Sequence, residues 1–363
     1  MAQQESFFPQ TVIAVIWDFD KTLIPGNMQA PLFAAFGVDE PTFWAESNAL
    51  ADYYAGHGYE RISKDTIYLN HILAYVRAGI FEGLNNMRLR ELGRDLKLYP
   101  GMPELLRKLN DRVAGNEELA KHGISVEHYV VSTGLRQTVL GSAIAKHIDD
   151  AWGCEFLEFS APPGYLNPGN WKPPPAASRE IVDIGYTIDN TTKTRAIFEI
   201  NKGVNKHPKE ISVNDRMDPE RRRVPVENMI YIADGPSDVP VFSILRQYGG
   251  KTMAVYNPDR QAEFNQVLDL QAQGRVDAVG PADYREMSHT ARCLNRWVDQ
   301  AAARIFERRE RLLGEHVQKP PQHLAEEAAE APPTAGRAEN PRGSRREDPL
   351  SQGDGATVDD IGP

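Results

Sequence analysis

Residues 11–23 read TVIAVIWDFDKTL. The first seven residues are mostly apolar and rich in β-branched side chains, a pattern typical of a strand buried on both faces of a parallel sheet. The run ends abruptly in two carboxylates, Asp18 and Asp20. Ligands of open α/β sheets bind outside the carboxyl ends of the strands, so this junction predicts a functional site there.

Similar apolar runs recur further along the chain, and each is followed by small or acidic residues. They span residues 128–131, 229–232, 251–256 and 276–279, with helical patterns at 193–200 and 239–248. Buried strands that alternate with helices predict an α/β fold with a largely parallel, Rossmann-like sheet.

The spacing of these runs predicts the domain organisation. Residues 24–94 are far longer than a minimal crossover, and their aromatic residues recur at helical spacing, so we expect an inserted helical cap. The core would then comprise residues 1–23 and 95–316, closed by a long amphipathic helix over 284–313. Residues 317–363 are rich in Pro, Glu, Ala and Gly, and we expect a disordered C-terminal tail.

The composition of the chain limits the kinds of molecule that it can be expected to bind. The net charge of −10 argues against binding to nucleic-acid phosphates. The two cysteines, Cys154 and Cys293, lack CxxC spacing, and no stretch has the length or apolarity of a signal peptide or a membrane span. We therefore expect a cytoplasmic protein with no membrane, nucleic-acid or obligate protein partner.

Hydrolysis of a phosphate monoester needs a nucleophile and an acid for the leaving oxygen. Asp18, ionised at neutral pH, can attack directly. Asp20 lies two residues on, where an extended segment places both carboxylates on one side. Neighbouring carboxylates diverge in pKa, which suits a nucleophile and a general acid/base.

Carboxylates are also the ligands that Mg²⁺ prefers. The candidate metal ligands are Asp18, Asp20, Asp234 and Asp238. Asp238 could instead orient a ligand or cap the helix that follows it.

Donors to the phosphate are expected from two further segments. The Ser132 hydroxyl and the amides of Thr133 and Gly134 follow the second run. Lys193, at an apparent helix start, is the favoured cation for the transferring group, with Lys202 in reserve.

The ordered set resembles the haloacid dehalogenase (HAD) superfamily, specifically its phosphoserine-phosphatase-like branch. Residues 18–23 match the first motif of that family, Ser132 the second, Lys193 the third and residues 234–238 the fourth, although Ala233 stands where the family often has glycine. The resemblance implies a Rossmann-like core with a cap inserted after the first motif. It also implies an aspartyl-phosphate intermediate, with Mg²⁺ held by Asp18, the main-chain carbonyl of Asp20, and Asp234.

The resulting hypothesis is a Mg²⁺-dependent phosphatase that hydrolyses a small phosphorylated metabolite. A phosphomutase or phosphotransferase and a catalytically silent binding module on the same fold are the alternatives. In this family the cap usually selects the leaving group. Four residues of the expected cap are candidate contacts to it, although surface packing explains them equally well: Tyr53, Tyr54, His57 and Arg61.

Overall fold

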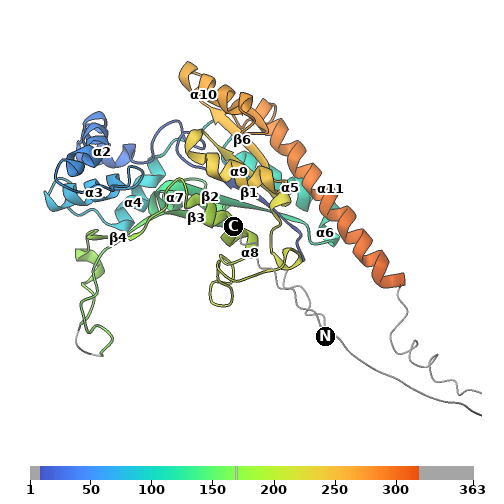
Figure 1. Ribbon diagram of the computed structural model, residues 1–363, viewed down its shortest axis with the longest axis horizontal. Helices are drawn as coiled ribbons and strands as arrows, with labels where there is room; N and C mark the ends of the chain where they lie inside the picture. The colour runs from blue at the N-terminus through green and yellow to red at the C-terminus, as the bar shows by residue number, and fades with distance from the viewer. Residues whose placement is uncertain (1–8, 168, 170, 319–363) are drawn as a thin grey trace, which may run out of the picture. The chain divides into compact units, whose positions relative to one another are not determined.

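The computed structural model describes residues 9–167, 169 and 171–318, and it contains one seven-stranded sheet (Figure 1). The strand order is β4-β3-β2-β1-β5-β6-β7, and every neighbouring pair is parallel except β3 and β4. The strands are β1 (Val12–Trp17), β2 (Ser125–Leu135), β3 (Asp150–Leu157), β4 (Asp183–Tyr186), β5 (Met229–Ala233), β6 (Lys251–Tyr256) and β7 (Ala278–Pro281). The predicted α/β fold with a largely parallel sheet is confirmed.

Helices connect these strands in the described part of the chain. They are α1 (Ala30–Phe36), α2 (Glu40–Ala55), α3 (Ile67–Arg77), α4 (Asn86–Leu92), α5 (Glu104–Ala114), α6 (Glu117–Lys121), α7 (Arg136–Gly141), α8 (Lys193–Lys202), α9 (Val239–Gln247), α10 (Gln261–Ala272) and α11 (His289–Gln318). A 3-10 turn, η1 (Gly93–Asp95), continues α4, and another, η6 (Pro236–Asp238), precedes α9.

Strand β1 occupies the middle of the sheet. All six of its residues are buried, as the apolar run predicts. Trp17 at its end pairs in register with Val130 of β2 and Ile232 of β5. The residues that follow β1 and β5, and the last residues of β2, therefore lie at the same edge of the sheet.

Helices cover both faces of the sheet. Successive side chains of a strand point to opposite faces, so His128 and Tyr129 of β2 mark the two sides. The His128 ring lies 2.9 Å from the carbonyl oxygen of Leu106 in α5, whereas Lys206, which follows α8, lies over the Tyr129 ring. Helices α5 and α8 therefore flank β2 from opposite faces.

Several element boundaries differ from the prediction. Strand β2 extends to Leu135, so Ser132, Thr133 and Gly134 belong to the strand and do not follow it. The pairing with β3 shifts register between Val131 and Leu135, which takes this segment out of the regular ladder. Strands β3 and β4 lie within residues 144–192, a stretch for which the sequence patterns predicted no strand.

Four helices, α1 to α4, lie within the stretch predicted to be a cap. Figure 1 shows α2, α3 and α4 (blue to cyan) gathered beside one another, away from α9 and α10. The predicted domain boundaries at residues 23/24 and 94/95 stay predictions. The predicted tail from residue 317 lies almost wholly outside the described residues.

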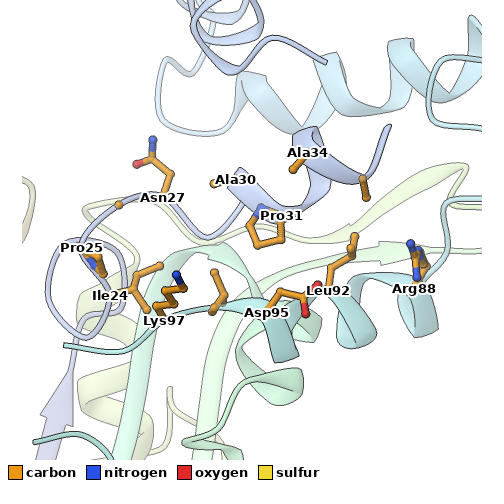
Figure 2. A pocket seen from close by; sticks show the side chains of 13 residues that line it. Ile24, Pro25, Asn27, Ala30, Pro31, Ala34, Arg88, Leu92, Asp95 and Lys97 are labelled. Atoms are coloured by element: carbon orange, nitrogen blue, oxygen red, sulfur yellow. The ribbon is translucent and has the colours of Figure 1, made fainter. Parts of the chain in front are cut away.

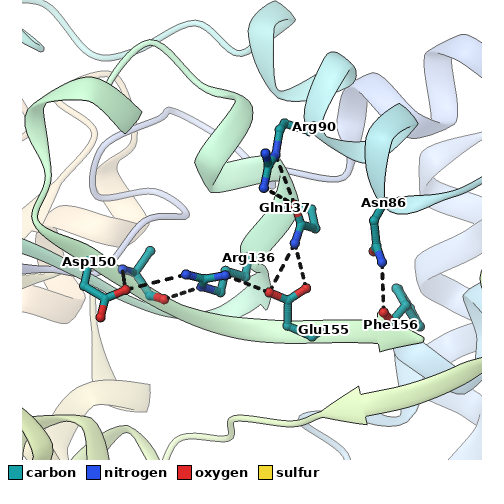
Figure 3. Close-up of polar contacts among 8 residues, drawn as sticks. Asn86, Arg90, Arg136, Gln137, Asp150, Glu155 and Phe156 are labelled. Carbon is teal, nitrogen blue, oxygen red and sulfur yellow. Dashed lines mark hydrogen bonds and ion pairs between the residues drawn. The ribbon is translucent and has the colours of Figure 1, made fainter. Parts of the chain in front are cut away.

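Polar contacts join α4 to strand β3 of the sheet (Figure 3). The Arg90 guanidinium donates to Gln137 Oε1 at 3.1 and 2.7 Å, and the Gln137 amide donates to both oxygens of Glu155 on β3 at 3.2 and 3.0 Å. Asn86, the first residue of α4, donates to the carbonyl oxygen of Phe156 at 3.0 Å. Helix α4 is thus held against β3, the strand that pairs with β4.

Candidate active site

A pocket of about 240 Å³ lies where the strand ends meet. The predicted site residues that line it are Asp18, Asp20, Ser132, Thr133, Gly134, Lys193 and Asp234. They come from four segments of the chain that are distant in sequence. Asp238 is fully buried and touches the pocket residue Lys193.

Asp18 extends the β1 ladder by one residue, because its backbone N–H donates to the carbonyl oxygen of Ile232 at 2.8 Å. Its carboxylate is buried and accepts a hydrogen bond from Lys193 Nζ at 2.9 Å. Burial raises the pKa of Asp18 to about 6, although Lys193 pulls in the opposite direction. The sheet therefore fixes the position of this carboxylate, and the lysine favours its ionised form.

Lys193, the first residue of α8, links two carboxylates inside the protein. Only 2% of the residue is exposed, and its Nζ lies 2.9 Å from Asp18 Oδ1 and 2.6 Å from Asp238 Oδ1. Burial alone would lower the pKa of Lys193, but Asp18 and then Asp238 raise it above its ordinary value. The lysine is therefore charged at neutral pH and places a positive charge beside Asp18.

Asp238 is held by donors on both of its oxygens. Oδ1 accepts from Lys193 and, at 2.6 Å, from the hydroxyl of Tyr231 on β5, while Oδ2 accepts from Ser237 Oγ at 2.9 Å. The helix-cap alternative does not hold, because the Asp238 side chain makes no capping hydrogen bond to α9. With its oxygens occupied in this way, Asp238 acts on the site by positioning Lys193.

Asp20 lies on the loop after β1. Its Oδ1 accepts from the backbone N–H of Met28 at 2.9 Å, which joins the two ends of the segment from Asp20 to Met28. Burial, and then the charge of Asp18, raise the pKa of Asp20 well above its ordinary value. A raised pKa favours the protonated form of Asp20, which is the form that a general acid needs.

Three carboxylates can approach one ion. Oxygen atoms of Asp18, Asp234 and Asp238 lie within 4.8 Å of one another, and the Asp20 side chain is outside this group. Burial and then Asp18 raise the pKa of Asp234 to about 7, so this carboxylate is short of nearby positive charge. Because Asp238 already accepts three hydrogen bonds, Asp18 and Asp234 are the carboxylates left for an ion, and these hard oxygen donors fit Mg²⁺.

The irregular end of β2 forms one side of the pocket, through Ser132, Thr133 and Gly134. Ser132 Oγ accepts from the backbone N–H of Gly134 at 3.0 Å, so its own proton is free to be donated. That contact also engages the Gly134 amide, which we predicted to be a donor to the phosphate. The carbonyl oxygen of Thr133 accepts from Tyr68 Oη at 2.8 Å and ties β2 to α3.

The reserve lysine lies elsewhere. Lys202 ends α8, and its Nζ donates to the carbonyl oxygens of Val213 at 2.6 Å and Asp215 at 2.5 Å. It does not line the pocket. Of the two lysines, the structure brings Lys193 to Asp18.

Within residues 24–94, the predicted cap, the residues that line the pocket differ from the four candidates named from the sequence. The pocket is lined by Asn27, Gln29, Trp44, Asp65 and Tyr68. None of Tyr53, Tyr54, His57 and Arg61 lines it, and Tyr53 is 59% exposed. Trp44 and Tyr68 belong to the aromatic helical pattern that marks the cap, whereas no sequence signal distinguishes Gln29 or Asp65.

A larger cavity of about 670 Å³ lies between α1 and α4 (Figure 2). Residues 24–27 form part of its wall, and Leu92, Asp95 and Lys97 form another part. It shares Asn27 with the active-site pocket but none of the site residues predicted from the sequence. The site residues predicted from the sequence therefore gather in the smaller of these two pockets.

No described helix combines the length and apolarity needed to cross a membrane.

No family model matches the chain. Similar solved structures include a phosphoserine phosphatase with a phospho-aspartyl intermediate analogue, which is 14% identical to this chain. The match covers 76% of this chain and 97% of that chain, with a TM-score of 0.42. A HAD family hydrolase from Salmonella enterica serovar Typhi is 13% identical to this chain. The match covers 75% of this chain and 67% of the hydrolase, with a TM-score of 0.43. Likeness at this level assigns no activity.

An uncharacterized protein of Borreliella burgdorferi is much more similar in sequence. It is 39% identical to this chain over 280 residues, which are 76% of this chain and 92% of that protein. This identity extends over nearly the whole of the relative. The chain therefore belongs to the same protein family as the uncharacterized protein of Borreliella burgdorferi.

Proposed function

We propose that the chain is a Mg²⁺-dependent phosphatase of the HAD type that hydrolyses a small phosphomonoester. One observation carries this proposal: the buried ion pair of Lys193 with Asp18, 2.9 Å apart, at a pocket that Asp20, Ser132 and Asp234 also line. The pocket volume of about 240 Å³ suits a small substrate.

In the first step, an Asp18 carboxylate oxygen attacks phosphorus, and the bond from phosphorus to the leaving oxygen breaks. Asp20 donates its proton to that oxygen, so the product leaves as a neutral alcohol. Lys193 and the Ser132 hydroxyl offer positive charge and a donor to the phosphoryl oxygens. The enzyme is left with an aspartyl phosphate on Asp18 and an ionised Asp20.

In the second step, Asp20 takes a proton from water, whose oxygen attacks the phosphorus of the aspartyl phosphate. The bond to the Asp18 oxygen breaks, and inorganic phosphate leaves. Both carboxylates return to their starting protonation states. When bound, Mg²⁺ would offset the charges of the phosphoryl group and Asp18, and Asp18 and Asp234 would hold it, with the Asp20 main-chain carbonyl as the family resemblance implies.

The test is phosphate release from p-nitrophenyl phosphate, with Mg²⁺ and with EDTA. We expect release that requires Mg²⁺ and that Asp18→Asn abolishes. Asp269→Asn, which changes an exposed carboxylate on α10, is the matched control and should keep wild-type activity. Release that persists in Asp18→Asn would exclude Asp18 as the nucleophile.

A further inference from the structure

A long loop joins α8 to β5. Apart from the 3-10 turn η4 (Pro219–Arg221), this α8–β5 loop, residues 203–224, contains no helix or strand. Its two ends are bonded to each other. The Val224 N–H donates to the carbonyl oxygen of Asn201 at 3.1 Å, and Asn201 Nδ2 donates to the carbonyl oxygen of Val224 at 2.7 Å. Long loops without strands are uncommon in compact domains, and those that are ordered are usually functional.

Side chains from outside the α8–β5 loop hold its backbone in place. Lys202 Nζ, at the end of α8, donates to two carbonyl oxygens of the loop at 2.6 and 2.5 Å. Gln10, which precedes β1 and is only 7% exposed, donates through Nε2 to the carbonyl oxygens of Pro219 at 2.7 Å and Arg222 at 2.9 Å. The loop is therefore pre-organised, and a ligand that binds there does not have to order it first.

A cavity of about 450 Å³ lies within this loop. Every residue that lines it belongs to the loop, and none of them lines the active-site pocket. Ile211 and Met217 provide apolar surface, and Arg216 and Arg221 provide positive charge. Sites for small organic ligands combine these features and have volumes of about 300–1,000 Å³.

The cations of this cavity lack partners, whereas the acids have them. The side chains of Arg216 and Arg221 make no hydrogen bond or ion pair with any other described residue. Asp215 Oδ2 accepts from the backbone N–H of Ser212 at 2.7 Å, and Glu210 Oε2 lies 3.9 Å from a ring nitrogen of a histidine in the same wall. In a chain of net charge −10, two unpaired arginines at one cavity indicate an anionic ligand.

We propose that this cavity binds a small organic phosphate, at a site separate from the one that carries out the proposed hydrolysis. The phosphate group, with a charge of about −1.5 to −2, accepts hydrogen bonds from Arg216 and Arg221, whose planar guanidinium groups match phosphate geometry. The apolar part of the ligand packs against Ile211 and Met217. A carboxylate carries a single charge and leaves one arginine without a counter-ion. No bond is made or broken here, so the inference does not depend on the proposed phosphatase function.

The probe for this site is phenylphosphonate, whose phosphorus–carbon bond leaves no ester to hydrolyse. Binding is followed by NMR in EDTA, with protein isotope-labelled at the methionine methyl groups. The Met217 signal, assigned with Met217→Leu, reports on this cavity, whereas the Met28 signal reports on the active-site pocket, because Met28 lies against Gly134. We expect phenylphosphonate to shift the Met217 signal saturably. Benzoate and inorganic phosphate should bind more weakly, benzoate by at least about tenfold, the size of one charge-assisted hydrogen bond.

Substitutions test which side chains hold the probe. Arg216→Gln and Arg221→Gln should each raise the Kd of phenylphosphonate, read at Met217, by at least about tenfold. Glu210→Gln should lower this Kd, because it removes an acid from the cavity wall. Lys209→Gln removes an exposed cation of the same loop that does not line the cavity, and as the matched control it should keep the Kd within about twofold. Unchanged positions of the other methionine signals show that each variant is folded.

Several results would overturn this inference. They are a Met217 signal that does not move at about 10 mM phenylphosphonate, a shift confined to Met28, and a Kd that both arginine variants leave unchanged or that Lys209→Gln raises equally. Benzoate or inorganic phosphate that binds as tightly as phenylphosphonate would exclude an organic phosphate as the ligand. None of these results bears on phosphate release from p-nitrophenyl phosphate, so the proposed phosphatase function stands or fails separately.

Discussion

Replacement of Lys193 by methionine tests the buried charge arrangement of the site. Methionine keeps the apolar stem inside the protein but removes the ammonium that lies 2.9 Å from Asp18 and 2.6 Å from Asp238. Those two carboxylates, 5% and 0% exposed, would lose the cation that they share. Removal of one partner from a buried pair costs about 3–5 kcal/mol of unfolding free energy, so we expect a loss of that size in Lys193→Met.

A second change separates charge from packing. In Lys193→Met combined with Asp238→Asn, one of the stranded carboxylates becomes neutral. Residues in direct contact couple by about 0.5–3 kcal/mol, so the double variant should recover about that much stability. Phosphate release should be about 100-fold or more below the wild-type rate in both variants, because the ammonium beside Asp18 no longer stabilises the transferring phosphoryl group.

Urea unfolding in EDTA, followed by circular dichroism, measures the stability, and release of phosphate from p-nitrophenyl phosphate in Mg²⁺ measures the activity. The reasoning is refuted if Lys193→Met unfolds within about 0.5 kcal/mol of the wild type, the range of an ordinary surface substitution. It is also refuted if the double variant is less stable than the single variant.

Three further predictions concern other parts of the structure. Burial lowers the pKa of His128 to about 4, so the folded protein holds this ring neutral. The contribution of the neutral ring to the free energy of unfolding is complete above pH 6.5 and is lost as the pH falls towards 4, a decrease of roughly 3 kcal/mol. Urea unfolding across that range should show this slope in the wild type, and an equal slope in His128→Gln would rule His128 out as its source. A Cβ at Gly141 would lie 1.8 Å from a carbonyl oxygen of α4, so Gly141→Ala should lower stability by about 1–3 kcal/mol, whereas Gly26→Ala, with open space around it, should not; equal melting temperatures would contradict this. Tyr231→Phe removes the 2.6 Å hydrogen bond to Asp238 and should cost about 1 kcal/mol and lower kcat more than it changes KM; an unchanged kcat would show that this hydroxyl does not position the site.

The centre of the site could be predicted from the sequence because its signals are local. A buried parallel strand shows as a short apolar run, and the residues that follow it are fixed at the edge of the sheet. Asp18 and Asp234 follow such runs directly, and Lys193 opens a helix, so their meeting follows from the fold. The pairing of Asp238 with Tyr231 was not predicted, because it depends on how the η6 turn packs back against β5.

The sheet edge and the cap wall could not be predicted in the same way. Strand β4 is mostly exposed and only four residues long, so it lacks the apolar run that marks the central strands. Gln29 and Asp65 reach the pocket only through the packing of α1 to α3, which no local pattern specifies. The aromatic spacing identified helices there but not which of their faces meets the site.

The most direct test of the proposed mechanism is to trap the phosphoryl group on the protein. A single turnover of p-nitrophenyl phosphate by excess enzyme in Mg²⁺, quenched in acid and digested, can be read by mass spectrometry. The account predicts one added phosphoryl group on the peptide that contains Asp18, absent in Asp18→Asn. A phosphoryl group on any other residue, or phosphate release with no labelled peptide at any time of quenching, would contradict it.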